Sequence, residues 1–158
     1  MRYLATRYLD DLTPGDRFAG GPVTVTVEDI VAYARQFDPQ PFHLDSEAAK
    51  DTVFAGLAAS GWHTAGLTMR MIVNGEGRLA GGFVGMGVEE LRWPKATRPG
   101  DTLRIESEVL EVRVSEKRPD RGIARVRTTT FNQDNETVQV MTANLLVPRR
   151  VDATAPAE

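Results

Sequence analysis

A carboxylate and an imidazole lie five residues apart in the short segment 37–43, FDPQPFH, which two prolines stiffen. Such a pair, Asp38 and His43, can jointly hold and activate a water molecule as general acid and base. A second segment, 56–63 (GLAASGWH), follows after a short gap and begins a helix with small residues. Backbone N–H groups at a helix start can stabilise an oxygen on which negative charge develops. Together these segments indicate an enzyme that acts on an activated carbonyl compound.

Composition limits the other possibilities. A chain of 158 residues suits one domain with a substantial core, which we place at residues 1–150, with 151–158 as a flexible C-terminal tail. There is no cysteine, and the formal charge is −3, from 19 basic and 22 acidic residues. These counts exclude thiol chemistry and argue against a nucleic-acid binder or a polybasic membrane module. Because neither a signal peptide nor a membrane-spanning run is evident, a cytoplasmic location is expected.

The first half of the chain predicts helices. Thr26 is a suitable N-cap for a helix that must end before Pro39, because the residue preceding a proline is disfavoured in the α region. Asp38 would therefore lie at the helix exit, with a short strand at 23–25 before the helix. Asp45 is expected to cap a second short helix, which leaves His43 in the connection between the two.

The next helical pattern runs from about Ser60 to Val73. It has apolar residues at three- and four-residue steps and few charges, so we expect it to be buried on nearly all sides.

The second half predicts an antiparallel sheet. Four apolar, β-rich runs are separated by turn residues, at 83–91, 102–114, 123–131 and 137–147. Within the second run the apolar phase shifts between Val109 and Leu110, which indicates a bulge or a strong bend. A buried helix followed by long antiparallel strands predicts an α+β fold in which the sheet wraps around the helix.

The hexad at residues 38–43, DPQPFH, resembles the D-x-N-P-x-H signature of the MaoC-like dehydratases, the family of (R)-specific enoyl-CoA hydratases. The similarity extends to the flanking segments, which are 11–16 (DLTPGD), 24–30 (TVTVEDI) and 92–103 (RWPKATRPGDTL), and covers most of residues 11–148. The resemblance implies a single hotdog domain, in which a long antiparallel sheet wraps around a central buried helix. It also implies a role in fatty acid metabolism and a homodimer or higher even oligomer.

The resemblance also implies a reaction. In this family the motif Asp and His bind a water that adds to a trans-2-enoyl thioester, giving an (R)-3-hydroxyacyl product. These roles fall on Asp38 and His43, and the Gly61 N–H is the expected oxyanion donor. Ser60 stands where the family usually has His, and Gln40 where it has Asn, so both are expected to shape substrate binding. Coenzyme A or an acyl carrier protein enters as part of the substrate, and no cofactor is implied.

Further substrate contacts are expected from residues near the helix start and from a basic cluster that could pair with coenzyme A phosphates, namely Trp62, His63, Arg92, Lys95 and Arg98. Each has a plainer alternative. His63 could fill a buried polar position, and the basic cluster could be a solvated loop. Apolar side chains that could shape an acyl pocket, or serve only as core, are Trp62, Met69, Met71, Phe83 and Met86.

Three alternatives to hydration by this chain stay open. A hotdog thioesterase would direct the water at the thioester carbonyl, and a non-catalytic subunit would bind an acyl thioester without turning it over. The chain could also be one partner of a heteromeric hydratase. A metal site is not expected, because the sequence offers no Cys ligand, no H-E-x-x-H pair and no dense carboxylate loop.

Overall fold

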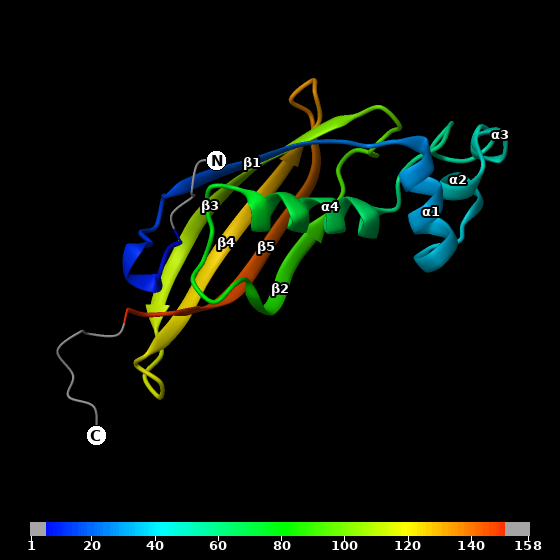
Figure 1. The fold of residues 1–158 in the computed structure, drawn as a ribbon. Coiled ribbons are helices and arrows are strands. Elements are labelled where there is room, and N and C mark those ends of the chain that lie inside the picture. Colours follow the sequence, from blue (N-terminus) through cyan, green and yellow to red (C-terminus); the bar gives the residue numbers. More distant parts are fainter. Residues whose placement is uncertain (1–5, 151–158) are drawn as a thin grey trace.

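The computed structural model of the protein describes residues 6–150. Five antiparallel strands form a sheet in the order β1-β3-β4-β5-β2, and helices lie between the first two strands of the sequence (Figure 1). In chain order the elements are η1 (Leu9–Asp11), β1 (Arg17–Thr24), α1 (Val27–Phe37), α2 (Pro41–Leu44), α3 (Ser46–Ala49), α4 (Gly61–Asn74), β2 (Val84–Arg92), β3 (Thr102–Val114), β4 (Arg121–Phe131) and β5 (Thr137–Pro148).

Helix α4 lies along one face of the sheet, and α1, α2 and α3 gather beyond one end of it (Figure 1). This is the hotdog arrangement that the sequence predicted, so the α+β fold class is confirmed. Within residues 6–150 no helix is long and apolar enough to cross a membrane. The predicted C-terminal tail, 151–158, lies outside the described residues.

The four predicted strands of the second half agree with β2 to β5 to within two residues at each end. The predicted irregularity is also confirmed, because the β3–β4 register shifts between Val109 and Glu111. The short strand predicted at 23–25 was wrong in its limits, since β1 begins at Arg17. Its sequence contains Gly20, Gly21 and Pro22, which suggest a turn. An edge strand tolerates them, here with a register shift between Gly20 and Val23.

Helix α4 is held to the sheet by apolar packing and by buried hydroxyl pairs. Met71 shares a core cluster with Leu103 and Ile105 of β3. Beside this cluster the Thr68 and Thr130 hydroxyls are 2.7 Å apart, and the Thr64 hydroxyl donates to that of Thr97 at 3.0 Å. Hydrogen bonds in a buried setting offset the cost of taking these hydroxyls out of water.

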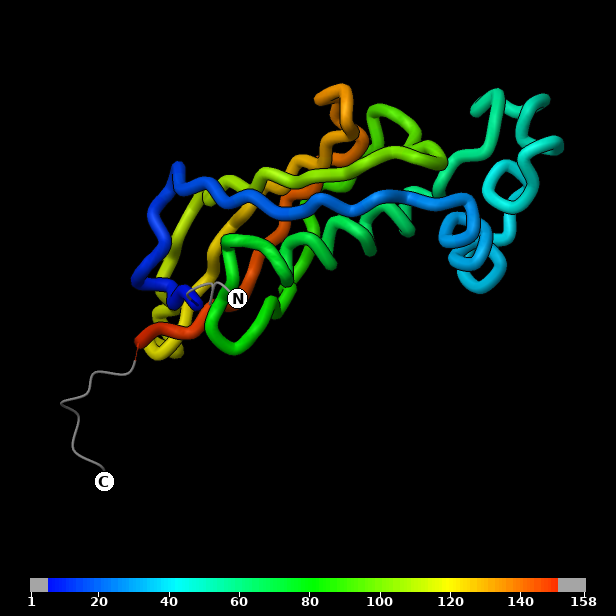
Figure 2. Tube along the Cα trace, turned by 45° about the horizontal axis from the view of Figure 1, so that its top comes forward, coloured from blue at the N-terminus to red at the C-terminus, as the bar shows by residue number. Residues whose placement is uncertain are grey.

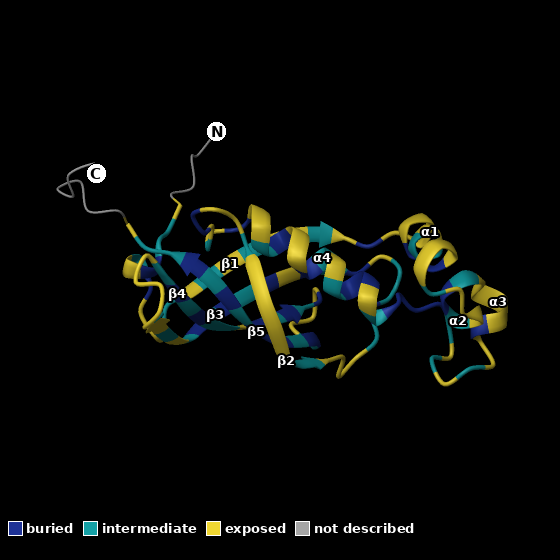
Figure 3. Cartoon of the chain, turned by 90° about the horizontal axis from the view of Figure 1, so that it is seen from below, coloured by how far each residue is buried: buried dark blue, intermediate teal, exposed yellow. Residues whose placement is uncertain are grey.

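The expectation that this helix is buried on nearly all sides was wrong for the isolated chain. Trp62, Met69 and Val73 are 59%, 41% and 41% exposed, and Figure 3 shows yellow patches on α4 and along β2. Apolar spacing alone cannot distinguish a face covered by the same chain from one covered by another molecule.

The chain leaves the sheet after β1, forms α1 to α3, and returns at the same end as α4 (Figure 2). Thr26 caps α1 by accepting from the Asp29 N–H, and α1 ends at Phe37, as predicted. Asp45 caps α3, also as predicted, with bonds from Glu47 and Ala48. His43 was expected in an irregular connection but lies inside the four-residue helix α2, where Pro41 supplies a favourable first turn.

Ile30 anchors α1 to the rest of the molecule. It is fully buried in the cluster that also contains Val25, Leu57 and Val138. We expect Ile30→Ala to lower the free energy of unfolding by about 2–5 kcal/mol, and Ile30→Val by about 0.5–1.5 kcal/mol. Urea unfolding curves measure both values.

Val27→Ala is the matched control, because Val27 lies on the same helix and is 44% exposed. Its effect should stay within about 0.5 kcal/mol. A similarly small effect of Ile30→Ala would show that α1 is not anchored through this side chain.

Candidate active site

Asp38 and His43 meet where three helix ends come together. Asp38 is the C-cap of α1, His43 belongs to α2, and Ser60 is the N-cap of α4. Asp38 Oδ2 lies 3.3 Å from His43 Nε2 and accepts a 2.7 Å hydrogen bond from the Ser60 hydroxyl. The side chains of Asp38 and His43 are 19% and 5% exposed. The pair is therefore largely shielded, with the carboxylate as its more accessible member.

The surroundings of Asp38 favour its charged form. Burial raises the pKa of this carboxyl group, but the hydrogen bonds from Ser60 and Gln40 outweigh burial, together with the charge of His43 when its ring is protonated. The net pKa therefore lies below its ordinary value. Gln40 donates to Oδ1 at 2.5 Å while Ser60 donates to Oδ2, so each oxygen has one donor and retains capacity to accept from a water. The carboxylate is thus ionised at neutral pH and able to act as a base.

The imidazole of His43 is oriented by a backbone group. Its Nδ1 lies 2.6 Å from the Ala58 carbonyl oxygen. A carbonyl can only accept, so Nδ1 carries the hydrogen and Nε2 is the nitrogen that faces Asp38. The rings of Phe42 and Phe54 lie 4.5 Å and 6.0 Å from the imidazole centroid. One ring nitrogen is therefore fixed by the chain, and the other is available for chemistry beside the carboxylate.

Gly61 is the first residue of α4, so its N–H has no partner within the helix. A Cβ at this position would lie 2.6 Å from the Trp93 indole ring, which packs against the helix start. The Trp93 Nε1–H donates to the buried Gln139 side chain at 2.9 Å. The close packing explains the glycine on structural grounds alone, and its role as an oxyanion donor stays a prediction.

The sequence analysis missed Trp93 and Gln139 as supports of the helix start. Gln139 could have indicated this contact, because it lies at an inward-facing position of an apolar strand and a buried glutamine needs a polar partner. The Ala58 carbonyl carried no signal, since every residue has one.

His63 joins α1 to α4. Its ring stacks on Tyr33 at 4.8 Å with an interplanar angle of 7°. Burial lowers the pKa of His63, and the charge of Asp29 opposes this shift only in part. Its Nδ1 is buried and has no hydrogen-bond partner within residues 6–150. The observed contacts are those of a packing residue, whereas Trp62, one position earlier, is exposed. Substrate contacts by both residues stay predictions.

The three residues of the predicted basic cluster have different surroundings. Arg92 pairs with Glu90 at 2.7 Å, and Lys95 pairs with Glu136; all four side chains are substantially exposed. The guanidinium of Arg98 instead donates to backbone carbonyls of the segment 54–57. Binding of coenzyme A by these three residues stays a prediction.

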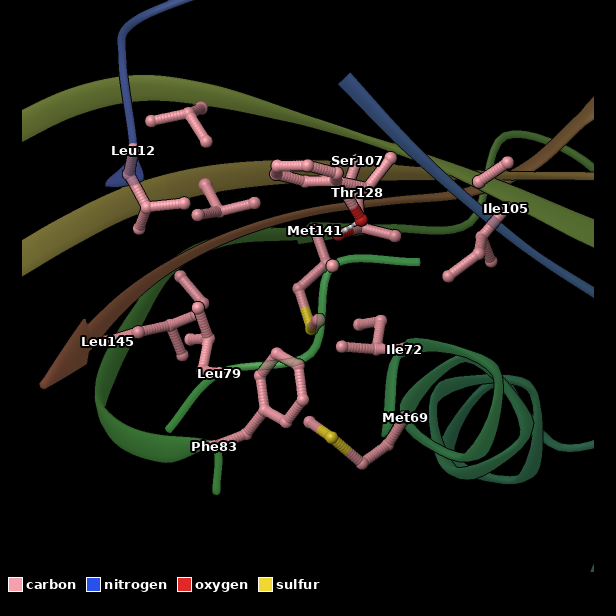
Figure 4. Close-up of a pocket in the computed structure, with 16 residues that line it drawn as sticks. Leu12, Met69, Ile72, Leu79, Phe83, Ile105, Ser107, Thr128, Met141 and Leu145 are labelled. Atoms are coloured by element: carbon pink, nitrogen blue, oxygen red, sulfur yellow. Dashed lines mark hydrogen bonds between the residues drawn. The ribbon is translucent and has the colours of Figure 1, made fainter. Parts of the chain in front are cut away.

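An apolar cavity lies between α4 and the sheet (Figure 4). Met69, Ile72 and Phe83 line it. Met69 follows Ser60 by nine residues, which is about 13 Å along a helix, so the cavity lies well away from Asp38. Of the predicted acyl-pocket residues, Met69 and Phe83 line this cavity, Met71 is core, and Trp62 and Met86 are exposed.

In the part of the chain that the structure describes, no three His, Cys, Asp or Glu side chains lie close enough to hold a metal ion.

Comparison with known proteins gives matches over most of the chain. A family model described as the MaoC-like domain matches residues 12–132. The uncharacterized protein YdeM of Bacillus subtilis (strain 168) is 31% identical over 142 residues, which make up 89% of this chain and 99% of the relative.

Solved structures also resemble most of the chain, and two of them are informative. The MaoC-like dehydratase from Rhodospirillum rubrum is 50% identical with a TM-score of 0.89, over 92% of this chain and 99% of that one. The unliganded (R)-hydratase PhaJ1 from Pseudomonas aeruginosa is 24% identical with a TM-score of 0.70, over 96% and 95%. The first match is close in sequence and fold, whereas the second supports the fold alone.

The hydrogen bond from Ser60 to Asp38 should affect how activity depends on pH. This bond lowers the pKa of Asp38, so Ser60→Ala should raise it. If the carboxylate form is the active one, activity falls as the pH drops through this pKa. The acidic limb of the kcat/KM profile should therefore move to higher pH in the variant, which initial rates across a pH series measure.

Ser60 also caps α4, so a variant that loses another helix cap is the appropriate control. Asp45→Ala removes the cap of α3 without touching Asp38, and its acidic limb should coincide with that of the wild type. An unmoved limb in Ser60→Ala would show that this hydroxyl does not set the pKa of the active carboxylate.

Proposed function

The chain belongs to the MaoC-like domain family, and we propose that it hydrates a trans-2-enoyl thioester reversibly to the (R)-3-hydroxyacyl thioester. One observation carries the proposal. An ionised carboxylate and an oriented imidazole lie 3.3 Å apart in a shielded site beside the start of a helix. Enoyl-CoA is the proposed substrate form, and the reaction needs no cofactor beyond the coenzyme A that the substrate carries.

In the proposed mechanism Asp38 and His43 hold one water molecule between them. Removal of a proton from this water lets its oxygen form a bond to the β-carbon of the enoyl thioester. The electron pair of the carbon–carbon double bond moves toward the thioester oxygen, and a proton is then delivered to the α-carbon. The product has gained one O–H group and one hydrogen, so the atoms of one water are accounted for. Asp38 and His43 act as a coupled acid and base.

Charge that builds on the thioester oxygen needs donors that are already in place. The Gly61 N–H at the start of α4 is the proposed donor. Trp93 packs against this glycine and is itself held by Gln139, so the start of the helix is supported from the sheet side. An oxyanion donor that is fixed before the reaction costs no reorganisation during it.

The proposed assembly is a homodimer that pairs through β2. This strand is an edge of the sheet, and Val84, Met86 and Val88 on it are 47%, 61% and 57% exposed. The opposite edge, β1, contains Pro22, which has no N–H, whereas residues 84–88 of β2 include neither a proline nor a charged side chain. Unprotected apolar edges tend to pair with another strand. A second copy on β2 would also approach the exposed apolar side chains of α4.

Asp38→Asn tests the reaction. The amide keeps the shape of the side chain but cannot act as a base, so turnover should fall by at least about a hundredfold. The assay follows loss of the conjugated enoyl-thioester absorbance with short, medium and branched enoyl-CoAs, and it records free thiol in parallel. Asp134→Asn, in the exposed β4–β5 turn, is the matched control and should leave turnover unchanged.

Absorbance loss without thiol release, abolished by Asp38→Asn alone, supports hydration. Thiol release would instead indicate a thioesterase. Full turnover by Asp38→Asn would overturn the assignment of this carboxylate.

Met86→Lys tests the proposed interface. A lysine at Met86 would bring a positive charge from each copy into the exposed apolar part of β2, so the variant should be monomeric under conditions in which the wild type is dimeric. Light scattering after size-exclusion chromatography measures both masses. Val114→Lys, at the far end of β3 and 42% exposed, should remain dimeric. A monodisperse wild-type monomer would contradict the proposal.

A further inference from the structure

Arg98 lies in the connection between β2 and β3, and its half-buried guanidinium points at a neighbouring loop instead of solvent. One arm, Nη1, donates to the carbonyls of Gly56 at 3.0 Å and Leu57 at 3.3 Å, and the other, Nη2, donates to that of Phe54. Three carbonyls within four residues of an irregular segment thus share one side chain. This loop has no regular secondary structure of its own, so Arg98 supplies hydrogen bonds that a helix or strand would otherwise provide.

The residues that follow this loop orient both members of the catalytic pair. The Ala58 carbonyl accepts from His43 Nδ1, and the Ser60 hydroxyl donates to Asp38. Between them, the Ala59 N–H donates to the carbonyl of Thr97, the residue just before Arg98. Arg98 therefore holds the chain just before Ala58, and Thr97 holds it between Ala58 and Ser60. Ala58 and Ser60 are the residues that orient His43 and Asp38.

Arg98 is itself fixed to the sheet. Its backbone N–H donates to Asp101 Oδ2 at 2.8 Å, and Asp101 is buried directly before β3. Gln133, from the β4–β5 turn, donates to the other oxygen of Asp101 at 3.0 Å. A chain of hydrogen bonds thus runs from the sheet through Asp101 and Arg98 to the loop, and from the loop to His43.

We propose that Arg98 is a positioning residue for Asp38 and His43, which it holds in place through the loop 54–57 and the residues 58–60 that follow it. The catalytic consequence rests on the hydratase function proposed above, but the structural consequence does not. With the loop held, the Ala58 carbonyl keeps the hydrogen of His43 on Nδ1 and leaves Nε2 toward Asp38. Without the clamp, the carbonyl moves and the imidazole loses its fixed tautomer. The three carbonyls engage three of the five guanidinium N–H groups, and the kinetic test below separates this role from the predicted contact with coenzyme A phosphates.

Lysine should not substitute for Arg98. An ammonium group is a single point of charge on a flexible stem, whereas the guanidinium holds several N–H groups in one plane. The N–H groups of an ammonium radiate from one nitrogen, so they cannot reach all three carbonyls that Arg98 contacts from Nη1 and Nη2. Arg98→Lys therefore keeps the positive charge but loses the planar arrangement of N–H groups. Arg98→Met removes the charge while retaining much of the aliphatic stem.

The kinetic test compares an enoyl-CoA with the corresponding enoyl-pantetheine, which lacks the nucleotide phosphates. A positioning role predicts that both variants lower kcat by about 10- to 100-fold with both substrates, because small displacements of reacting groups have effects of this size. KM for the enoyl-CoA should change by less than about threefold. A phosphate-binding role predicts a higher KM with the enoyl-CoA alone and an unchanged kcat, which would overturn the proposal.

The second readout needs no substrate. The chain has two histidines, so ¹⁵N NMR of histidine-labelled protein resolves the tautomer of His43, with His63→Phe to assign the signals. The wild type should show a protonated Nδ1, and both Arg98 variants should show a mixture of tautomers or an exchange-broadened Nδ1–H. Arg118→Lys, in the exposed β3–β4 turn, should match the wild type.

The NMR readout separates failure of this proposal from failure of the proposed function. A changed tautomer supports the clamp even if the wild type hydrates none of the substrates. An unchanged tautomer in Arg98→Lys overturns it, whatever the kinetics. Should Arg98→Met fail to fold, Arg98→Lys decides the question alone.

Discussion

Two helix ends are joined by one hydrogen bond, from the Ser60 hydroxyl to Asp38 Oδ2. Asp38 follows the last residue of α1, whereas Ser60 precedes the first residue of α4, so the bond connects the helices beyond the end of the sheet to the helix that lies along it. The same serine oxygen accepts from the Trp62 N–H and caps α4. Because one hydroxyl contacts both the carboxylate and the helix start, a single residue links the position of the Asp38 side chain to that of the α4 N–H groups.

The site shields Asp38 and His43 from solvent, yet it supplies enough hydrogen-bond donors to keep the Asp38 carboxylate charged. Burial alone would favour a neutral carboxyl at Asp38, but donors on both of its oxygens and the neighbouring imidazole reverse that preference. His43 is more deeply buried and depends on a main-chain carbonyl for its orientation. A water held by these two groups would face a base that is charged and an imidazole whose ring cannot rotate freely. This arrangement suits addition of water to a polarised double bond.

Much of this architecture could be read from the sequence, for identifiable reasons. The apolar residues of strands β3 to β5 and of helices α1 and α4 recur with clear periodicity. Thr26 and Asp45 have side chains that commonly cap helices, so they indicate where α1 and α3 begin. Helix α2 was missed because its four residues are too few for a periodic pattern. The pairing of Asp38 with His43 followed from their spacing within one motif. The carbonyl of Ala58 and the three that Arg98 holds could not be predicted, because backbone groups are the same at every position and only the folded loop brings them together.

The two ends of the segment between Val25 and Ser60 lie close together. Val25 exchanges backbone hydrogen bonds with Gly100 and Asp101, and Ala59 donates to Thr97, so both ends are fixed to one short connection between β2 and β3. A loop tolerates changes in length at small entropic cost, so the exposed turns of this segment can vary, whereas Ile30 and Leu57 tie it to the core. Insertions in those turns would leave the strand pairing intact, because the segment contributes no strand to the sheet. The sheet can therefore stay constant while the segment that carries Asp38 and His43 varies between its buried anchors.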